Sequence, residues 1–312
     1  MTRRWLILGA TALSLSAASL TGCTQATGET DDYVQTEQGI LGGQLADDTY
    51  SAVGAIVLES PAPFSSTSVI CSGTLVGPSK VLTARHCTQE IARREAQGSK
   101  AYFNIGLLAY DPDQSIRITG FTQAPSSPTH PGLLFDGGRD MAVANLNRAP
   151  HGVTPVRLGE FTSDLLGEQF TIAGFGRDDN NFAGLRYAGP ATARSLGGAW
   201  YPLLFDNKYG PYLNWYFDDA VTSNPSAREA KAWWEVFTLE PGFELLAGGL
   251  EGEALGCFGD SGGPLLLGDS ADNLTAYAVS FASEASQSEI CTRGGAYVVN
   301  NNVMLGFIDG AL

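Results

Sequence analysis

The sequence is poor in the residues that bind nucleic acid or metal ions. Its 18 lysines and arginines stand against 33 acidic residues, and the formal net charge of −15 argues against nucleic acid or an anionic membrane surface as a partner. It contains only three histidines, and its five cysteines show none of the usual zinc-binding spacings. We therefore expect no metal and no other cofactor.

The apolar stretch near the N-terminus, residues 5–20, is short for a stable membrane span. It follows Arg3 and Arg4 and is succeeded by small residues, so segment 1–22 is predicted to be an export signal. The signal ends in Leu-Thr-Gly-Cys, which resembles the lipobox of bacterial lipoproteins and implies a lipid anchor on Cys23. The alternative is an ordinary signal peptide followed by an unpaired thiol.

Glycine and proline are abundant, with 38 and 15 residues, and short apolar runs rich in Val, Ile, Leu and Thr recur between turn signals. This pattern favours β structure with many turns over a helical bundle. A chain of 312 residues can bury a substantial core, either as one large domain or as two fused halves.

The cysteines other than Cys23 fall into two local pairs, Cys71 with Cys87 and Cys257 with Cys291. We interpret them as two disulfides formed in an oxidising compartment. By loop-closure arguments each bond stabilises the fold by roughly 3–4 kcal/mol. The protein is therefore expected to be exported, either held at a bacterial cell envelope by lipid or secreted after processing, and to be a monomer.

Residues 256–264 read Gly-Cys-Phe-Gly-Asp-Ser-Gly-Gly-Pro. Glycines on both sides of Ser261 remove Cβ crowding, so the backbone can turn sharply and approach a ligand closely. The amides of Gly259 and Ser261 could then point at one spot as donors to a developing oxyanion. A glycine-rich loop before a strand is the plainer interpretation. The stretch resembles the nucleophile loop of the trypsin/chymotrypsin family of serine proteases.

Two further stretches resemble motifs of the same family. Residues 80–87, Lys-Val-Leu-Thr-Ala-Arg-His-Cys, are similar to its histidine motif, and we expect His86 to be held at a strand end; Arg85 replaces the usual alanine. Asp140, directly before an apolar run, is similar to the catalytic aspartate. Asp136 is the competing candidate, but glycines and no strand follow it. The order His86, Asp140, Ser261 is that of a chymotrypsin-like triad.

The resemblance implies an all-β fold of two packed six-stranded antiparallel β-barrels, formed by residues 40–157 and 158–312, with a short C-terminal helix. A partly helical insertion is expected at about 195–243, with a helix at 226–237. The insertion is rich in aromatic residues. It either packs against the barrel or forms a flap that rims the cleft and restricts substrates.

The activity implied by the resemblance is that of a serine endopeptidase acting on polypeptides. Ser261 would attack the peptide carbonyl, His86 would transfer the proton, and Asp140 would orient the imidazole. The alternative is a catalytically silent cell-surface binding lipoprotein on the same fold. Such relatives usually lose a member of the triad, whereas this sequence keeps all three.

Motif alignment with the family also suggests which residues bind substrate. Leu255 would form the floor of the specificity pocket, with Ala282 and Gly295 in its walls. Ser280 would hydrogen-bond the buried aspartate, and the backbone of Ser280 and Ala282 would pair with an extended peptide. An uncharged floor disfavours Arg and Lys, because their charge would lose water without gaining a partner. We therefore expect a preference for apolar residues before the cleaved bond.

Ile40, with the Leu-Gly-Gly that follows it, resembles the new N-terminus of activated family members. In those proteins a cut before the isoleucine frees an α-amine that pairs with the aspartate preceding the nucleophile, here Asp260. Gly39 stands where arginine or lysine is usual, so the cut would not be tryptic. The acidic segment 23–39 is expected to be a tether or pro-segment, and this cut would release the domain from a lipid on Cys23. A turn before the first strand is the plainer interpretation.

Overall fold

The computed structural model describes residues 40–63, 65–127, 139–178, 182–218, 226–285 and 291–312. All of them belong to one compact unit of the chain, Glu37–Leu312. The predicted export signal, the tether and Cys23 lie outside the described residues, as does Asp136.

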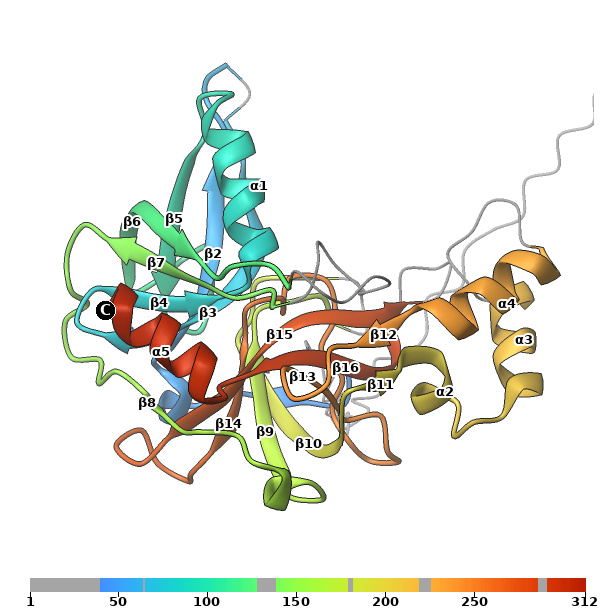
Figure 1. The fold of residues 1–312 in the computed structure, drawn as a ribbon. Helices are drawn as coiled ribbons and strands as arrows, with labels where there is room; N and C mark the ends of the chain where they lie inside the picture. Colours follow the sequence, from blue (N-terminus) through green and yellow to red (C-terminus); the bar gives the residue numbers. More distant parts are fainter. Residues whose placement is uncertain (1–39, 64, 128–138, 179–181, 219–225, 286–290) are drawn as a thin grey trace, which may run out of the picture. The chain divides into compact units, whose positions relative to one another are not determined.

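The first half of the chain forms a closed six-stranded antiparallel barrel in the order β2-β3-β4-β7-β6-β5 (Figure 1). Its interior is apolar and tightly packed: a Cβ on Gly54 would come within 2.5 Å of the ring of Phe103, which is fully buried. Glycine in this strand therefore leaves room for a large aromatic side chain. The strands are β2 (Val53–Glu59), β3 (Thr67–Gly77), β4 (Lys80–Thr83), β5 (Lys100–Ile105), β6 (Gln114–Gln123) and β7 (Ala142–Leu146).

The second half forms another ring of six antiparallel strands, which closes because β9 pairs with both β14 and β10. The short strand β1 (Gln44–Leu45) adds to β10, and β8 (Arg157–Leu158) lies parallel to β15. The two-barrel prediction is thus confirmed. The ring consists of β9 (Gln169–Gly174), β10 (Tyr187–Leu196), β13 (Glu244–Ala247), β16 (Cys291–Val299), β15 (Thr275–Ala285) and β14 (Pro264–Leu267).

The C-terminal helix α5 (Asn302–Ala311) was expected from the sequence and is present. The side chain of Asn301 caps it by accepting hydrogen bonds from the amides of Val303 and Met304. The helix packs against β7, and Lys80 donates to the carbonyl of Ala311, so the end of the chain is tied to the first barrel.

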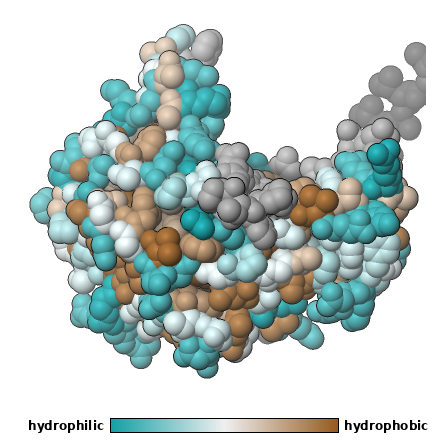
Figure 2. All heavy atoms as spheres, in the orientation of Figure 1, coloured by the Kyte–Doolittle hydropathy of each residue, from teal (hydrophilic) through white to brown (hydrophobic). Residues whose placement is uncertain are grey.

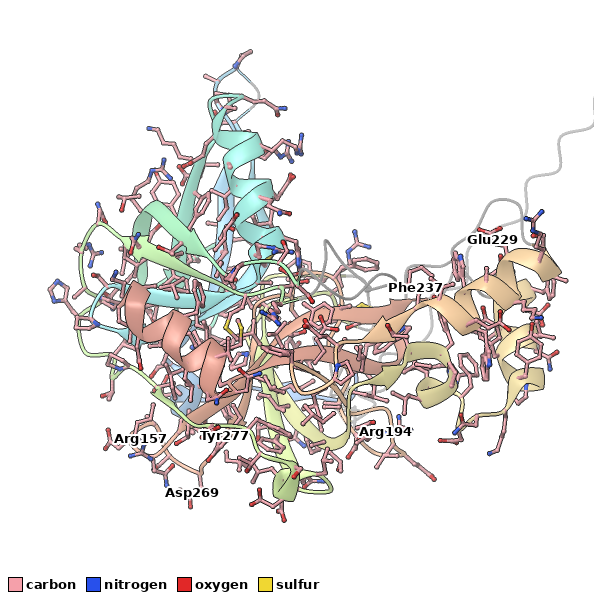
Figure 3. The ribbon with its side chains drawn as sticks, in the orientation of Figure 1. Arg157, Arg194, Glu229, Phe237, Asp269 and Tyr277 are labelled. Atoms are coloured by element: carbon pink, nitrogen blue, oxygen red, sulfur yellow. A yellow bond between two sulfur atoms is a disulfide. The ribbon has the colours of Figure 1, made fainter. Side chains whose placement is uncertain are left out.

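The insertion contains α2 (Trp200–Leu204), α3 (Tyr209–Asp218) and α4 (Ala227–Val236), enclosed by the paired strands β11 (Gly198–Ala199) and β12 (Thr238–Leu239). Only α4 was expected; Ser226 caps it, and Glu229 lies in its first turn at the far end from Phe237 (Figure 3). Helix α3 was not expected, because its segment holds Gly, Pro and aromatic residues, which have poor helix propensity.

Mutual packing of aromatic rings stabilises the insertion. The ring of Tyr201 stacks on that of Trp233 with centroids 5.9 Å apart, and those of Tyr212 and Trp234 are 4.9 Å apart. Arg293 of β16 lies over the ring of Phe205, 4.0 Å from its centroid. Most of these aromatic residues thus form the core of the insertion itself, which explains their abundance without a role in binding.

Apolar residues form small, separate patches on the face of the molecule that Figure 2 shows. Isolated exposed apolar side chains are normal on soluble proteins. Within the described part of the chain, no helix combines the length and apolarity needed to cross a bilayer.

Candidate active site

His86 and Asp140 form a doubly hydrogen-bonded pair. His86 Nδ1 lies 2.6 Å from Asp140 Oδ2, and the backbone amide of His86 donates to Asp140 Oδ1 at 2.8 Å. Asp140 is buried, whereas the His86 side chain is 30% exposed. Because a carboxylate only accepts hydrogen bonds, Nδ1 is the nitrogen that carries the proton in the neutral imidazole, and Nε2 is then the acceptor.

His86 lies in the first turn of α1 (Arg85–Glu95), not at a strand end as we expected. The strand stops at Thr83, and the following residues include many good helix formers and bury Ile91 against the barrel. Backbone amides in the first turn of a helix have no partner within the helix. The carboxylate of Asp140 satisfies the amide of His86, so the helix start itself helps to place the pair.

The guanidinium of Arg85, the unusual residue before the histidine, points toward the segment that follows β6. Its Nη1 donates to Ser126 Oγ at 2.7 Å and to the carbonyl of Ala124 at 3.4 Å. The side chain is buried. These contacts direct the charge of Arg85 toward Ser126.

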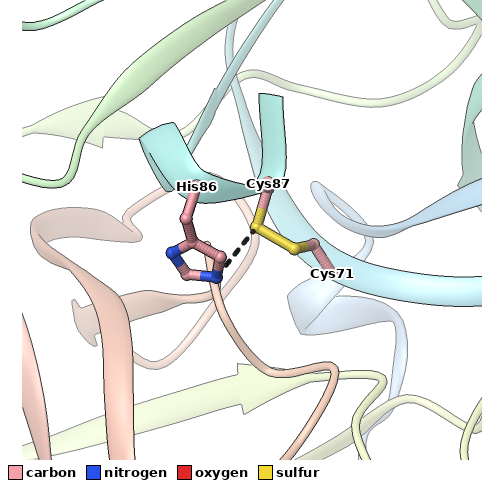
Figure 4. Close-up of side chains that lie close together, drawn as sticks. All are labelled: Cys71, His86 and Cys87. Atoms are coloured by element: carbon pink, nitrogen blue, oxygen red, sulfur yellow. Dashed lines mark hydrogen bonds between the residues drawn. A yellow bond between two sulfur atoms is a disulfide. The ribbon is translucent and has the colours of Figure 1, made fainter. Parts of the chain in front are cut away.

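The disulfide between Cys71 and Cys87 lies directly beside the imidazole (Figure 4). Cys87 Sγ is 3.6 Å from His86 Nε2 and 3.7 Å from the carbonyl oxygen of Ser261. One sulfur atom therefore contacts both the histidine and the serine residue. Although the ligand atoms of Cys71, His86 and Cys87 lie within 4.8 Å of one another, the two sulfurs are bonded to each other and are not available to a metal.

Ser261 is partly exposed, and its loop is held by backbone hydrogen bonds to both barrels. Ser72 of β3 donates its amide to the carbonyl of Ser261 at 2.8 Å, and Gly262 donates to the carbonyl of Ser280 in β15 at 2.7 Å. Gly262 has φ +86°, and a Cβ there would lie 3.0 Å from the amide nitrogen of Ala84. Only glycine fits this close approach of the loop to the first barrel.

The proposed oxyanion donors, the amides of Gly259 and Ser261, make no hydrogen bond to any described residue. Gly259 has φ +101°, a conformation that L side chains rarely adopt, and a Cβ there would lie 2.9 Å from Gly176 Cα. A loop that leaves two amides without protein partners beside the serine is what an incoming oxyanion requires.

His86 and Ser261 line the same cavity of about 200 Å³. Ser280 and Ala282, both expected to bind substrate, also line it. The other lining residues were not predicted to bind substrate, although most of them lie within the serine motif or next to Ser280 and Ala282. They are Cys257, Phe258, Phe281, Ser283 and Cys291.

Leu255 and Gly295 are not among the residues that line this cavity. Leu255 donates its amide to the carbonyl of Leu41 at 2.8 Å and packs near the disulfide of Cys257 and Cys291. Gly295 lies in β16 opposite Ser283. The side chain of Ser280 hydrogen-bonds the hydroxyl of Tyr297 and not Asp140, whose hydrogen bonds to described residues are those with His86.

Asp260 is buried directly behind the serine loop. Its carboxylate accepts hydrogen bonds from the amides of Gly176 and Cys257, each at 2.8 Å. Burial raises the pKa of Asp260 to about 7, while these two amides lower it. Ile40 is buried as well, with φ +46°, and lines a small internal cavity together with Asp260. Ile40 and Asp260, the two residues expected to pair after activation, thus line the same internal cavity.

Comparison with known proteins agrees with this architecture. Residues 49–188 match the family model of Trypsin, a range that holds His86 and Asp140 but ends before Ser261. No curated protein matches the sequence. Among solved structures, neuropsin, a serine protease expressed in the limbic system of mouse brain, matches with a TM-score of 0.57 and 20% identity over 87% of this chain and 99% of that one. In fold, and over residues 49–188 in sequence, this chain is trypsin/chymotrypsin-like.

Proposed function

We propose that this protein is an exported serine endopeptidase with the triad His86, Asp140 and Ser261. The observation that carries the proposal is the hydrogen bond of 2.6 Å between His86 Nδ1 and Asp140 Oδ2, together with the cavity that His86 and Ser261 both line. Two disulfides are typical of proteins that fold in an oxidising compartment, which supports export.

Each residue has one role in the proposed mechanism. Ser261 Oγ attacks the peptide carbonyl while His86 Nε2 takes its proton, and the imidazolium then donates this proton to the leaving amine. Asp140 keeps Nδ1 protonated and stabilises the imidazolium. The amides of Gly259 and Ser261 bind the oxyanion of the tetrahedral intermediate, and each is worth about 3–4 kcal/mol of transition-state stabilisation. Water then hydrolyses the acyl-enzyme with His86 as base.

A fluorophosphonate probe tests this function directly. We expect it to label Ser261 in a 1:1 complex, as mapped by peptide mass spectrometry, and to abolish hydrolysis of a peptide library. Labelling requires an activated serine, so a folded protein that has been cut before Ile40 and neither reacts nor hydrolyses peptides would instead support the silent binding protein.

The substrate preference is expected to be apolar at the residue before the cleaved bond. Among the described residues that line the cavity of His86 and Ser261, the side chains are aromatic, small or hydroxyl-bearing and none is acidic. A bound Arg or Lys would therefore lose its hydration without an opposite charge to replace it. A cleavage profile of a peptide library measures this preference, and cleavage mainly after Arg or Lys would contradict it.

Activation is proposed to follow a cut between Gly39 and Ile40. The new α-ammonium would replace a neutral amide next to Asp260, whose pKa burial raises to about 7 in the uncut chain. A buried charge without an opposite charge is unfavourable, so pairing with the ammonium would stabilise the ionised carboxylate of Asp260 and the loop that carries it. If Cys23 is lipidated, the same cut would release the domain from the membrane. Mass spectrometry of the mature N-terminus tests both steps, and active protein with an intact Gly39–Ile40 bond and a lipid would contradict them.

The pH dependence of stability is expected to differ between the uncut and cut forms. In the uncut chain the pKa of Asp260 is raised, so its protonated form stabilises the fold. This contribution to the free energy of unfolding is complete below about pH 4 and is lost as the pH rises through 7. After the cut, the ammonium lowers this pKa, and the contribution is instead lost on acidification. Burial also raises the pKa of Glu244 to about 7, but this effect is common to both forms. Urea unfolding between pH 4 and 8 measures the difference, and identical curves would contradict the pairing.

A further inference from the structure

Arg139, the residue before Asp140, is held by the insertion. Its guanidinium forms a two-pronged ion pair with Glu240: Nη2 donates to Oε1 at 3.0 Å and Nε donates to Oε2 at 3.3 Å. The pair is largely buried, with side chains 17% and 6% exposed. The guanidinium also lies 3.8 Å from the ring centroid of Phe243. Charge, fork geometry and stacking therefore restrict this side chain to one position.

The backbone at Arg139 has a conformation that needs such support. Its φ is +53°, which is uncommon for a residue with a Cβ. Its carbonyl accepts a hydrogen bond from the amide of Met141 at 2.8 Å, so a tight turn encloses Asp140. This turn sets the direction of the Asp140 side chain. The ion pair with Glu240 fixes Arg139, the first residue of the turn.

Glu240 is itself fixed from two sides. Ser127 donates its hydroxyl to Glu240 Oε1 at 2.8 Å, and the amide of Glu240 donates to Glu244 Oε2 at 2.8 Å. Glu244 is fully buried and returns the contact through its own amide, which donates to the carbonyl of Glu240 at 2.9 Å. Burial raises the pKa of Glu244. A hydrogen bond from the backbone of Arg139 lowers this pKa, and the negative charge of Asp140 raises it. The carboxyl of Glu244 therefore interacts with both residues of the turn.

We propose that Glu240 is a positioning residue for catalysis, which holds Asp140 against His86 through the side chain and strained backbone of Arg139. Glu240 comes directly after β12, the strand that closes the aromatic insertion. The insertion thus supplies a support for the triad from the second half of the chain, while Arg139 and Asp140 come from the first. The inference rests on the proposed peptidase function for its kinetic test only.

Glu240→Gln tests the role, because it removes the charge and keeps an oxygen for Ser127. A displacement of Asp140 would lower kcat by about tenfold with KM within twofold, since misplacing a reacting group by a fraction of an ångström has effects of this order. Arg139→Lys keeps the positive charge but loses the two-pronged hydrogen bonding and the stacking on Phe243. Its kcat is expected to lie between those of Glu240→Gln and wild type. In the double variant Glu240→Gln/Arg139→Lys, kcat would fall by less than the product of the two single losses, because both substitutions act on the same contact.

The matched control is Glu95→Gln. It removes one partner of another Arg–Glu pair, Glu95 with Arg117 at 2.7 Å, at the far end of α1. Its kcat is expected to equal that of wild type, and its loss of thermal stability should be smaller, because this pair is more exposed than Arg139 with Glu240. An equal loss of kcat in both variants, or a rise in KM alone for Glu240→Gln, would overturn the proposal.

Proton NMR gives a readout that does not depend on turnover. The proton between His86 Nδ1 and Asp140 Oδ2 is expected at low field, and Glu240→Gln should shift or broaden it while Glu95→Gln leaves it unchanged. An unchanged signal in a folded Glu240→Gln variant would overturn the positioning role. If that variant does not fold, Phe243→Leu, which removes only the stacked ring, is judged by the same criteria. A wild-type protein without peptidase activity would overturn the proposed function, and the signal would still decide the positioning role.

Discussion

Replacing Ser261 with alanine is expected to lower kcat by about six orders of magnitude, the size of effect seen when a triad nucleophile is removed. Without Oγ no acyl-enzyme forms, and His86 has no alcohol to activate. The amides of Gly259 and Ser261 remain, so a small rate above the uncatalysed reaction should persist. The measurement is steady-state hydrolysis of an apolar peptide substrate at high enzyme concentration.

Two controls separate loss of the nucleophile from loss of structure. The thermal unfolding midpoint of Ser261→Ala should match that of wild type, because the hydrogen bonds of the loop are made by its backbone. Ser66→Ala removes an exposed hydroxyl in the connection between β2 and β3 and should retain full activity. Retention of even half the activity by Ser261→Ala would exclude the proposed mechanism.

Asp140→Asn is expected to lower kcat by about 10⁴-fold, the size of effect that this change has in a serine–histidine–aspartate triad. Both carboxylate oxygens of Asp140 accept hydrogen bonds from His86. The amide of asparagine can present only one oxygen. If that oxygen stays on the backbone amide, the NH₂ group faces Nδ1 and moves the imidazole proton to Nε2, where it blocks removal of the serine proton. Kinetics at pH 7 to 8 measure the loss.

The matched control is Asp269→Asn, in an exposed turn where the side chain of Asn273 donates to Asp269. Asp269 does not line the cavity of His86 and Ser261, so the same chemical change there should leave kcat unchanged. A loss of less than about tenfold in Asp140→Asn would mean that Asp140 does not set the tautomer of His86. Asp136, the competing residue in the sequence, would then be the next to substitute.

Much of the site could be predicted from the sequence because its chemistry lies in short stretches. The nucleophile loop, the histidine motif and the aspartate before an apolar run are each local patterns, and the two barrels follow from the family they resemble. Both disulfides were predicted from the placement of their cysteines. Prediction was less successful where conformation depends on distant contacts: His86 was expected at a strand end and lies in a helix, and helices α2 and α3 of the insertion were not expected.

The sequence alone determined which groups are available: three side chains in the order of a chymotrypsin-like triad, glycines that permit a close turn, and an overall negative charge. Tertiary structure decided which of them meet. Helix α3 forms because aromatic rings from several segments bury one another, and Arg139 adopts its strained conformation because Glu240, about 100 residues later, holds it. Such contacts join residues far apart in the chain, and their free energy depends on burial and geometry that exist only after the barrels have closed.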